Sequence, residues 1–218
     1  MTQYDVNPTS QGTVMLQSNN PNTKRFLEVA MNDLKQSKIK IKIYKKSIRG
    51  IDILDGIDGY FDDDAREIGI YKDHRWLETF VHEYAHFLQW RDGDPTFAAY
   101  YKYNYNPLLM IDRWLERKIT YDKRVENSFN IIRNNEISCD KMAIKLINKY
   151  KLPIQTEKYI KKANFQILFY HCVEKQRTWQ VSEIYSNKKL WDCIPKTLRE
   201  SYVQHVPSKL MRMAIESF

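Results

Sequence analysis

The pattern of hydrophobic and polar positions predicts helices over most of this chain. Apolar residues recur with helical spacing over residues 22–38, behind an Asn or Thr that can cap a helix. A longer apolar stretch over residues 73–91 is followed by Asp92, Gly93 and Pro95, which stop helices, so it predicts a second helix. The same spacing predicts further helices at residues 107–118, 122–150, 154–177 and 207–217.

Two short segments near the N-terminus predict a small β-sheet. Over residues 39–43 isoleucines alternate with lysines, a period of two that is typical of a strand with one apolar and one cationic face. Turn-forming Asp-Gly pairs precede residues 60–71, whose pattern predicts a β-hairpin. Little strand signal follows, so we predict a predominantly helical α+β fold with a small N-terminal sheet and additional C-terminal helices. We expect residues 1–22 to form an arm, either loose or docked late, ahead of a single domain over residues 23–218.

Composition narrows the class of protein. The chain has 218 residues, 43% of them hydrophobic, with 6 Gly and 7 Pro, which provides for one core and excludes a disordered or collagen-like chain. The 3 cysteines are widely spaced, which favours reduced thiols over a disulfide framework or a thiolate metal site. Because the N-terminus lacks a secretory pattern and no apolar run has membrane-spanning length, we expect a cytoplasmic protein without a membrane partner. The net charge of +8 is compatible with an anionic partner but does not require one.

The main chemical signal is the sequence His82-Glu83-Tyr84-Ala85-His86, an H-E-x-x-H motif inside a predicted helix. Histidines four residues apart lie one turn from each other on the same helix face, where both can bind one zinc ion. Glu83 lies roughly a quarter turn from His82, so its carboxylate can accept a proton from a zinc-bound water without ligating the metal. The motif therefore predicts His82 and His86 as metal ligands and Glu83 as a general base.

A catalytic zinc site needs a third protein ligand, and we predict Glu136 in this role. Glu136 lies in a predicted helix, and Asp140, four residues later, shares its face. One carboxylate can complete the zinc site while the other accepts the far N–H of a ligating histidine, so we predict Asp140 as the outer partner of His82. Asp92 and Glu126 are the alternative third ligands. Asp92 would point away from the histidines in a continuing helix, and Glu126 lacks an acid four residues later.

The combination of His82-Glu83-x-x-His86 with Glu136-x-x-x-Asp140-x-x-Ala143 resembles the gluzincin metallopeptidases. The resemblance covers roughly residues 39–147 and implies a zincin-like metal-site core there, with residues 148–218 as a helical C-terminal extension. It implies Zn²⁺ as the cofactor and a peptide or protein as the substrate, hydrolysed by a zinc-activated water. The hairpin strand that ends at Tyr71 is similar to the edge strand on which that family binds extended substrate. The 49 residues between His86 and Glu136 exceed the gap in compact members, so we expect an inserted helical segment over or beside the site.

A second resemblance concerns the C-terminal stretch. Leu152-Pro153, Tyr159, Trp179 and Pro195 belong to a pattern that looks like uncharacterised phage-encoded zincin-like proteins. That resemblance implies action in the cytoplasm of an infected bacterial host. It implies no particular substrate and no oligomeric state.

Peptide hydrolysis at such a site also needs a hydrogen-bond donor to the developing oxyanion, commonly a Tyr or His outside the metal motif. The candidates are His171 and Tyr170 on a late predicted helix, and a tyrosine of the Tyr100–Tyr105 run. We take His171 as the leading candidate catalytic residue, although a lone histidine is more often a satisfied polar group. His74 and His205 have no partner pattern and receive no role.

Two other functions are compatible with the sequence. A non-catalytic zincin-like protein could keep zinc for structure and bind a host protein, and a fourth protein ligand at the metal would favour this alternative. A nucleic-acid-binding protein could use the seven basic residues from Lys35 to Arg49. Such a run is more often the solvated side of an edge strand, and the aspartates over residues 52–64 would partly cancel its field. The sequence therefore predicts a zinc metallopeptidase first and favours nucleic acid less as a partner.

Overall fold

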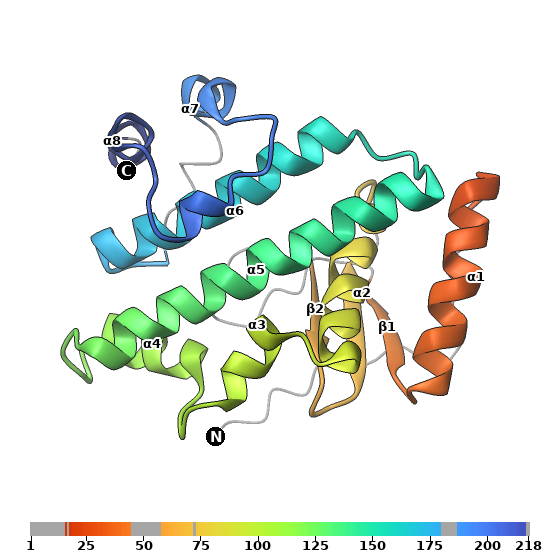
Figure 1. The fold of residues 1–218 in the computed structure, drawn as a ribbon, viewed down its shortest axis with the longest axis horizontal. Helices are drawn as coiled ribbons and strands as arrows, with labels where there is room; N and C mark the ends of the chain where they lie inside the picture. Colours follow the sequence, from red (N-terminus) through yellow and green to blue (C-terminus); the bar gives the residue numbers. More distant parts are fainter. Residues whose placement is uncertain (1–15, 17, 45–57, 72, 180–186, 217–218) are drawn as a thin grey trace.

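One long helix organises the molecule. The computed structural model describes residue 16 and residues 18–44, 58–71, 73–179 and 187–216. Its longest helix, α5 (Lys123–Tyr150), runs across the middle of the molecule (Figure 1). The first two helices and a three-stranded sheet lie on one side of α5, and the last helices lie on the other side. The predicted class, a mostly helical α+β fold with a small sheet, is confirmed.

The first helix, α1 (Pro21–Gln36), begins where its sequence supplies a cap. The Asn20 side chain accepts hydrogen bonds from the backbone N–H groups of Asn22 and Thr23, and Pro21 occupies the first turn, where a missing N–H has no cost. The predicted helix over residues 22–38 is thus confirmed to within two residues at each end.

The sheet contains β1 (Lys40–Tyr44), β2 (Gly59–Asp62) and β3 (Glu67–Tyr71) in the order β1-β3-β2. β2 and β3 form the predicted antiparallel hairpin, and β1 pairs with β3 in parallel. The expectation that the strand ending at Tyr71 lies at the edge is wrong, because β3 is the central strand and β1 occupies its second edge. The first four residues of β3 are all buried, as expected of a strand covered on both faces. Within the described residues, β2 is the antiparallel edge strand.

The helix that carries the H-E-x-x-H motif, α2 (Trp76–Asp92), ends where the sequence predicts. Gly93 follows it with a left-handed backbone, φ 69°, which glycine adopts without the steric cost of a Cβ atom. The buried residues of α2 lie around most of its circumference, since the helix packs on the sheet on one side and on α5 on another. Between α2 and α5 the chain forms α3 (Pro95–Ala98), the 3-10 turn η1 (Ala99–Tyr101) and α4 (Pro107–Leu115).

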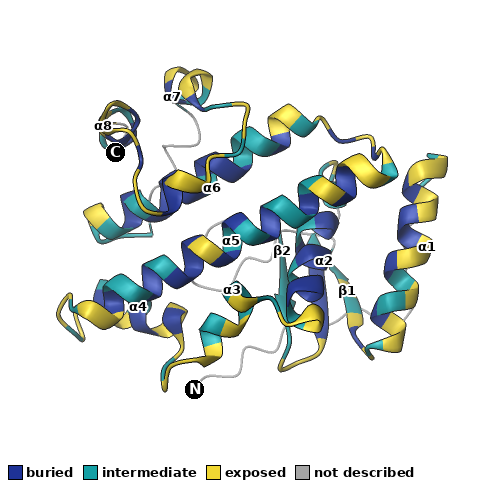
Figure 2. Ribbon diagram, viewed as in Figure 1, coloured by how far each residue is buried: buried dark blue, intermediate teal, exposed yellow. Residues whose placement is uncertain are grey.

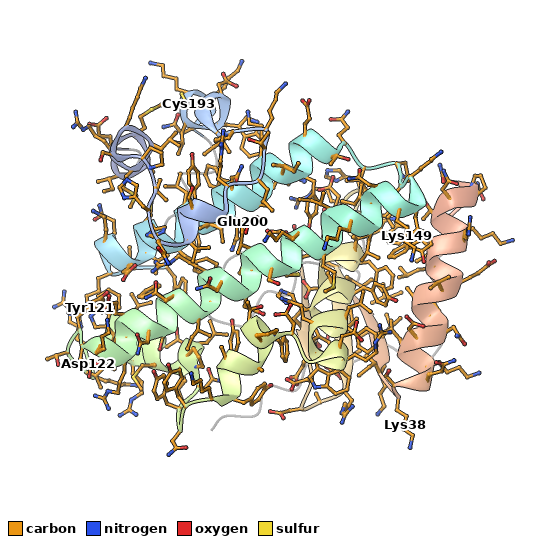
Figure 3. The ribbon with its side chains drawn as sticks, in the orientation of Figure 1. Lys38, Tyr121, Asp122, Lys149, Cys193 and Glu200 are labelled. Carbon is orange, nitrogen blue, oxygen red and sulfur yellow. The ribbon has the colours of Figure 1, made fainter. Side chains whose placement is uncertain are left out.

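The C-terminal part adds helices on the opposite side of α5. The predicted helices over residues 154–177 and 207–217 are confirmed as α6 and α8, whereas α7 and the 3-10 turn η3 were not predicted. Glu200 of η3 forms an ion pair with Lys141 of α5, which ties this part to the central helix (Figure 3). Among the described residues, no helix combines the length and the apolar character that crossing a membrane requires. The bounds are α6 (Thr156–Gln176), α7 (Lys188–Cys193), η3 (Glu200–Val203) and α8 (Ser208–Ile215).

Two hydrophobic cores meet along α5. The N-terminal core is formed by α1, the sheet, α2 and the C-terminal half of α5, and the C-terminal core by α4, the N-terminal half of α5, α6, α7, η3 and α8. Ile137 belongs to the C-terminal core and Cys139 to the N-terminal core, so the boundary crosses α5 at these residues. Figure 2 shows buried residues along α2 and on α5, where the two helices pack together. The predicted third ligand and its neighbouring acid therefore lie at the junction of the two cores.

Candidate metal centre

The packing of α2 against α5 brings three predicted ligands together. Oε2 of Glu136 lies 3.4 Å from Nε2 of His82 and 3.8 Å from Nε2 of His86. Both distances are too long for a good N–H···O hydrogen bond, which spans about 2.7–3.2 Å. Two donor atoms each about 2.1 Å from one tetrahedral zinc ion lie about 3.4 Å apart. The spacing of these three atoms therefore fits ligands of a shared cation better than partners in a hydrogen bond.

The far side of the His82 ring faces a carboxylate and a phenol. Nδ1 of His82 lies 3.2 Å from Oδ1 of Asp140 and 3.2 Å from the hydroxyl of Tyr159, and that hydroxyl donates to the same Asp140 oxygen at 2.9 Å. Because a carboxylate oxygen only accepts, Nδ1 of His82 carries a proton, and in the neutral ring Nε2 keeps its lone pair. Asp140 thus lies where the sequence predicts. Tyr159, on α6, was not assigned to the site because no spacing in the sequence links it to α2.

The far side of the His86 ring faces an amide. Nδ1 of His86 lies 2.8 Å from Oε1 of Gln89, which is fully buried. The Gln89 amide nitrogen contacts the Thr96 hydroxyl and the backbone oxygen of Asn135, both at 3.2 Å. The sequence gives Gln89 no role, so this contact is new.

Glu83 is buried beside the paired histidines, with 7% of its surface exposed. Burial raises the pKa of its carboxyl group above the ordinary value, and the two imidazoles only partly offset that effect. Gly59 lets β2 lie close to this part of α2. A Cβ atom at that position would come within 2.5 Å of Thr79 Cγ2 and 3.1 Å of Glu83 Cγ. A raised pKa is suited to a group that must accept a proton and release it again near neutral pH.

Glu136 has the opposite electrostatic balance. Burial alone would raise the pKa of its carboxyl group, but the adjacent imidazoles of His82 and His86, which favour the carboxylate most when they are protonated, outweigh burial and hold the pKa well below the ordinary value. Glu136 is therefore anionic, whereas Glu83, on the helix of the two imidazoles, is shifted toward its neutral form. One carboxylate is suited to ligate a cation and the other to carry a proton.

Cys139 also lies close to the histidines, and its Sγ atom and their ring nitrogens fall within 4.8 Å of one another. Sγ is almost equally close to the two ring nitrogens of His82, at 3.7 Å from Nδ1 and 4.0 Å from Nε2. One contact argues against Cys139 as a metal ligand, because its thiol donates to the backbone oxygen of His82 at 3.3 Å. We therefore prefer Glu136 to Cys139 as the third ligand.

His171 does not join this group, so the sequence prediction that placed it in the active site is not supported by its contacts. Its Nε2 lies 2.7 Å from the backbone oxygen of Tyr202, and its Nδ1 faces Nη1 of Arg133 at 3.4 Å. Both ring nitrogens thus have partners in the C-terminal half of the molecule. Tyr170 is buried in the C-terminal core. The sequence could not exclude either residue, because the pattern of α6 does not reveal which of its faces meets α5.

Tyr100 is the tyrosine of the Tyr100–Tyr105 run that comes near the site. Burial raises the pKa of its phenol, and the Glu136 carboxylate raises it further, which indicates a neutral hydroxyl in the field of Glu136. The segment that carries it, α3 and η1, is tied to the sheet because the Tyr101 hydroxyl donates to Asp63 of the β2–β3 turn. This is the segment beside the site that the long gap between His86 and Glu136 predicts.

The alternative ligands and the basic run lie elsewhere. Asp92 is exposed and forms an ion pair with Arg91, and Glu126 forms an exposed pair with Lys123. In the basic run, Lys42 pairs with Glu67 on the neighbouring strand, as expected for a solvated strand face. Residues 45–57, which include Lys45, Lys46 and Arg49 of the run, lie outside the described residues.

Five of the six residues predicted for the active site thus converge where α2 packs on α5, and His171 is the exception. Two more side chains, Gln89 and Tyr159, contact the far nitrogens of the paired histidines. What the arrangement offers chemically is a three-donor cation site with a proton acceptor beside it. Comparison of the chain with protein-family models, with curated proteins and with solved structures found no match.

Proposed function

We propose that this protein is a zinc-dependent metallopeptidase whose metal ligands are His82, His86 and Glu136. The observation that carries the proposal is the approach of two Nε2 atoms from α2 to one Glu136 oxygen from α5, at 3.4 and 3.8 Å. Two imidazoles and a carboxylate form a donor set typical of catalytic zinc, with a fourth position left for water or substrate. The motif helix beside a small sheet, with the third donor on a later helix, supports a zincin-like core over residues 39–147.

The chain's own residues divide the work of peptide hydrolysis. A zinc ion bound there would polarise the scissile carbonyl and lower the pKa of a water molecule. The Glu83 carboxylate, whose pKa burial raises, accepts a proton from the attacking water and delivers it to the leaving nitrogen as the C–N bond breaks. Asp140 and Tyr159 hold the His82 ring by its Nδ1–H. Tyr100 is the proposed hydrogen-bond donor to the developing oxyanion, since burial and the charge of Glu136 raise the pKa of its phenol and keep the hydroxyl protonated.

The edge strand β2 suggests how an extended peptide would bind. Within the described residues β2 pairs only with β3, so its outer edge can add a substrate strand through backbone hydrogen bonds. Gly59 brings this strand close to Glu83. A peptide paired with β2 would therefore pass near the general base.

The decisive experiment measures zinc content and hydrolysis together. The purified protein should contain one zinc per chain by elemental analysis and should cleave members of a quenched fluorescent peptide library. Glu83→Gln should keep its zinc and lose about 10²–10⁴-fold in turnover, because only the proton acceptor has been removed. Glu126→Gln, at an exposed position on α5, is the matched control and should match the wild type in both measurements. Undiminished turnover in Glu83→Gln would remove Glu83 from the mechanism, and a protein without zinc would overturn the proposal.

The position of Cys139 supports one alternative function. If its thiolate rotated onto the metal, four protein ligands would close the site, and the protein would be a non-catalytic zincin-like binding protein. Cobalt-substituted protein distinguishes the two, since a thiolate ligand adds an intense near-ultraviolet charge-transfer band. The peptidase proposal expects no such band and unchanged zinc affinity in Cys139→Ala. A strong band that Cys139→Ala abolishes would favour the binding protein.

A further inference from the structure

We infer that Gln89 and the start of α3 form a hydrogen-bonded relay that fixes the tautomer of His86 and thereby orients it as a metal ligand. The inference rests on the metal site proposed above but not on peptide hydrolysis, so it applies equally to a peptidase and to a binding protein. It assigns a role to a buried polar side chain that the H-E-x-x-H motif does not include.

The orientation of the Gln89 amide follows from its partners. One of its two terminal atoms lies 3.2 Å from the backbone oxygen of Asn135, which can only accept a hydrogen bond. That terminal atom must therefore be the NH₂ group, and the opposite atom, which faces His86, must be the oxygen. A backbone carbonyl on α5 thus decides which end of the amide the histidine meets.

The tautomer of His86 follows in turn. Oε1 of Gln89 can only accept, so Nδ1 of His86, 2.8 Å away, carries the ring proton. In the neutral ring Nε2 is then left with its lone pair, and this is the nitrogen that faces Glu136. With the reverse amide orientation, His86 would carry its proton on Nε2 and could not ligate a cation beside Glu136.

The relay continues to a charged group at the start of α3. The second N–H of the amide donates to the Thr96 hydroxyl at 3.2 Å, and that hydroxyl donates to Oδ1 of Asp94 at 2.5 Å. Asp94 also caps α3 by accepting the backbone N–H of Thr96, and it accepts the Ser138 hydroxyl from α5. The Gln89 amide thus donates along two branches, one directly to the Asn135 carbonyl and one through Thr96 to the Asp94 carboxylate. Because each branch ends at a group that can only accept, the direction of every hydrogen bond in the relay is set.

The two histidines are consequently held by different chemistry. The carboxylate of Asp140 is the partner of His82, whereas His86 depends on a neutral amide that must itself be held in one orientation. Outer-shell partners of this kind typically change metal affinity about 10–100-fold when they are removed. Gln89 is a positioning residue, since it acts on the metal only through His86.

The test compares zinc affinity and imidazole spectra in a small set of variants. Gln89→Met keeps the side-chain volume but removes the acceptor and both donors, and should weaken zinc binding about 10–100-fold in a chelator competition. Gln89→Glu keeps an acceptor for Nδ1–H and should bind zinc more tightly than Gln89→Met. Gln176→Met, at an exposed position on α6, is the matched control and should bind zinc as the wild type does. Thr96→Val should show a smaller loss than Gln89→Met, and it serves as the test variant if Gln89→Met does not fold.

A nuclear magnetic resonance measurement separates positioning from general stability. In zinc-loaded protein with ¹⁵N-labelled histidines, the His86 Nδ1 proton should be visible and slow to exchange in the wild type and lost to rapid exchange in Gln89→Met. Wild-type affinity in Gln89→Met, or ligation through Nδ1 of His86, would overturn the inference. If the wild type binds no zinc, the proposed metal site fails, and the metal-free spectrum then decides the relay alone. A proton on Nδ1 of the neutral His86 ring supports the relay, and a proton on Nε2 refutes it.

Discussion

The molecule holds half-buried histidines in two places, and their partners differ. In the C-terminal half, the two ring nitrogens of His171 contact Arg133 and the backbone of Tyr202. Where α2 packs on α5, His82 and His86 each use Nδ1 for a hydrogen bond and direct Nε2 toward one oxygen of Glu136, beyond good hydrogen-bond distance. Burial and charge are common to both places. At the candidate metal centre, by contrast, two histidine nitrogens and one carboxylate oxygen face a common point without forming good hydrogen bonds to one another.

The largest expected effect concerns Arg133 in the C-terminal half. The Arg133 side chain is 4% exposed and pairs with Glu174 at 2.5 Å, so Arg133→Met leaves a largely buried carboxylate without its cationic partner. We expect a loss of about 3–5 kcal/mol in the free energy of unfolding, with or without zinc. Lys123→Met breaks an exposed pair on the same helix and should cost less than about 1 kcal/mol. Denaturant unfolding of both variants measures the difference, and equal losses would mean that the Arg133 pair is not structural.

Removing Glu136 should have the contrasting effect. Zinc at about 100 times its dissociation constant should stabilise the wild type by about 2.7 kcal/mol, because the folded state alone presents the assembled ligands. In Glu136→Ala we expect that increment to vanish, since the third ligand is gone. Thermal unfolding with zinc and with chelator measures the increment, and Arg133→Met, which should keep it, is the control. A full zinc increment in Glu136→Ala would return the third ligand to another residue.

The sequence predicted the parts of this site that follow from local periodicity. Helical spacing within α2 places His82 and His86 on one face, and the same rule pairs Glu136 with Asp140 on α5. The structure brings these side chains together, and metal binding itself stays a prediction.

Partners that depend on tertiary packing could not be predicted from the sequence. Tyr159 is 77 residues from His82, and the carbonyl that orients Gln89 is 46 residues away along the chain. The contacts of His171 with Arg133 and Tyr202 could not be predicted, because the rotation of α6 about its axis is set by packing against α5. Strand β3 was misassigned as an edge because its parallel partner, β1, precedes the hairpin and leaves no local mark on it.

The hydroxyl of Tyr159 provides a finer test of the comparison. It donates to Asp140 in a buried position, so Tyr159→Phe should cost about 1–2 kcal/mol of stability and about tenfold in zinc affinity. Tyr121 donates to Glu174 at an exposed position on the other side of the molecule, and Tyr121→Phe should change zinc affinity not at all. Chelator competition on both variants measures the contrast. Equal zinc affinities in the two would show that Tyr159 packs against His82 without influencing the metal.

The smallest expected effect is a pH dependence that His171 contributes. Burial, and then the charge of Arg133, lower the pKa of His171 from 6.5 to about 4. Between these pH values the unfolded chain binds a proton that the folded protein does not, so the stability that His171 contributes above pH 6.5 is lost as the pH falls toward 4. Allowing for solvent screening of a partly exposed ring, we expect a loss of about 1–2 kcal/mol. In His171→Gln the amide can still donate to the Tyr202 carbonyl but cannot titrate, so unfolding measured with chelator from pH 7 to pH 4 should show a shallower slope than the wild type. Identical slopes would show that the His171 ring titrates alike in the folded and unfolded states, and that the C-terminal half does not bury it as a neutral structural group.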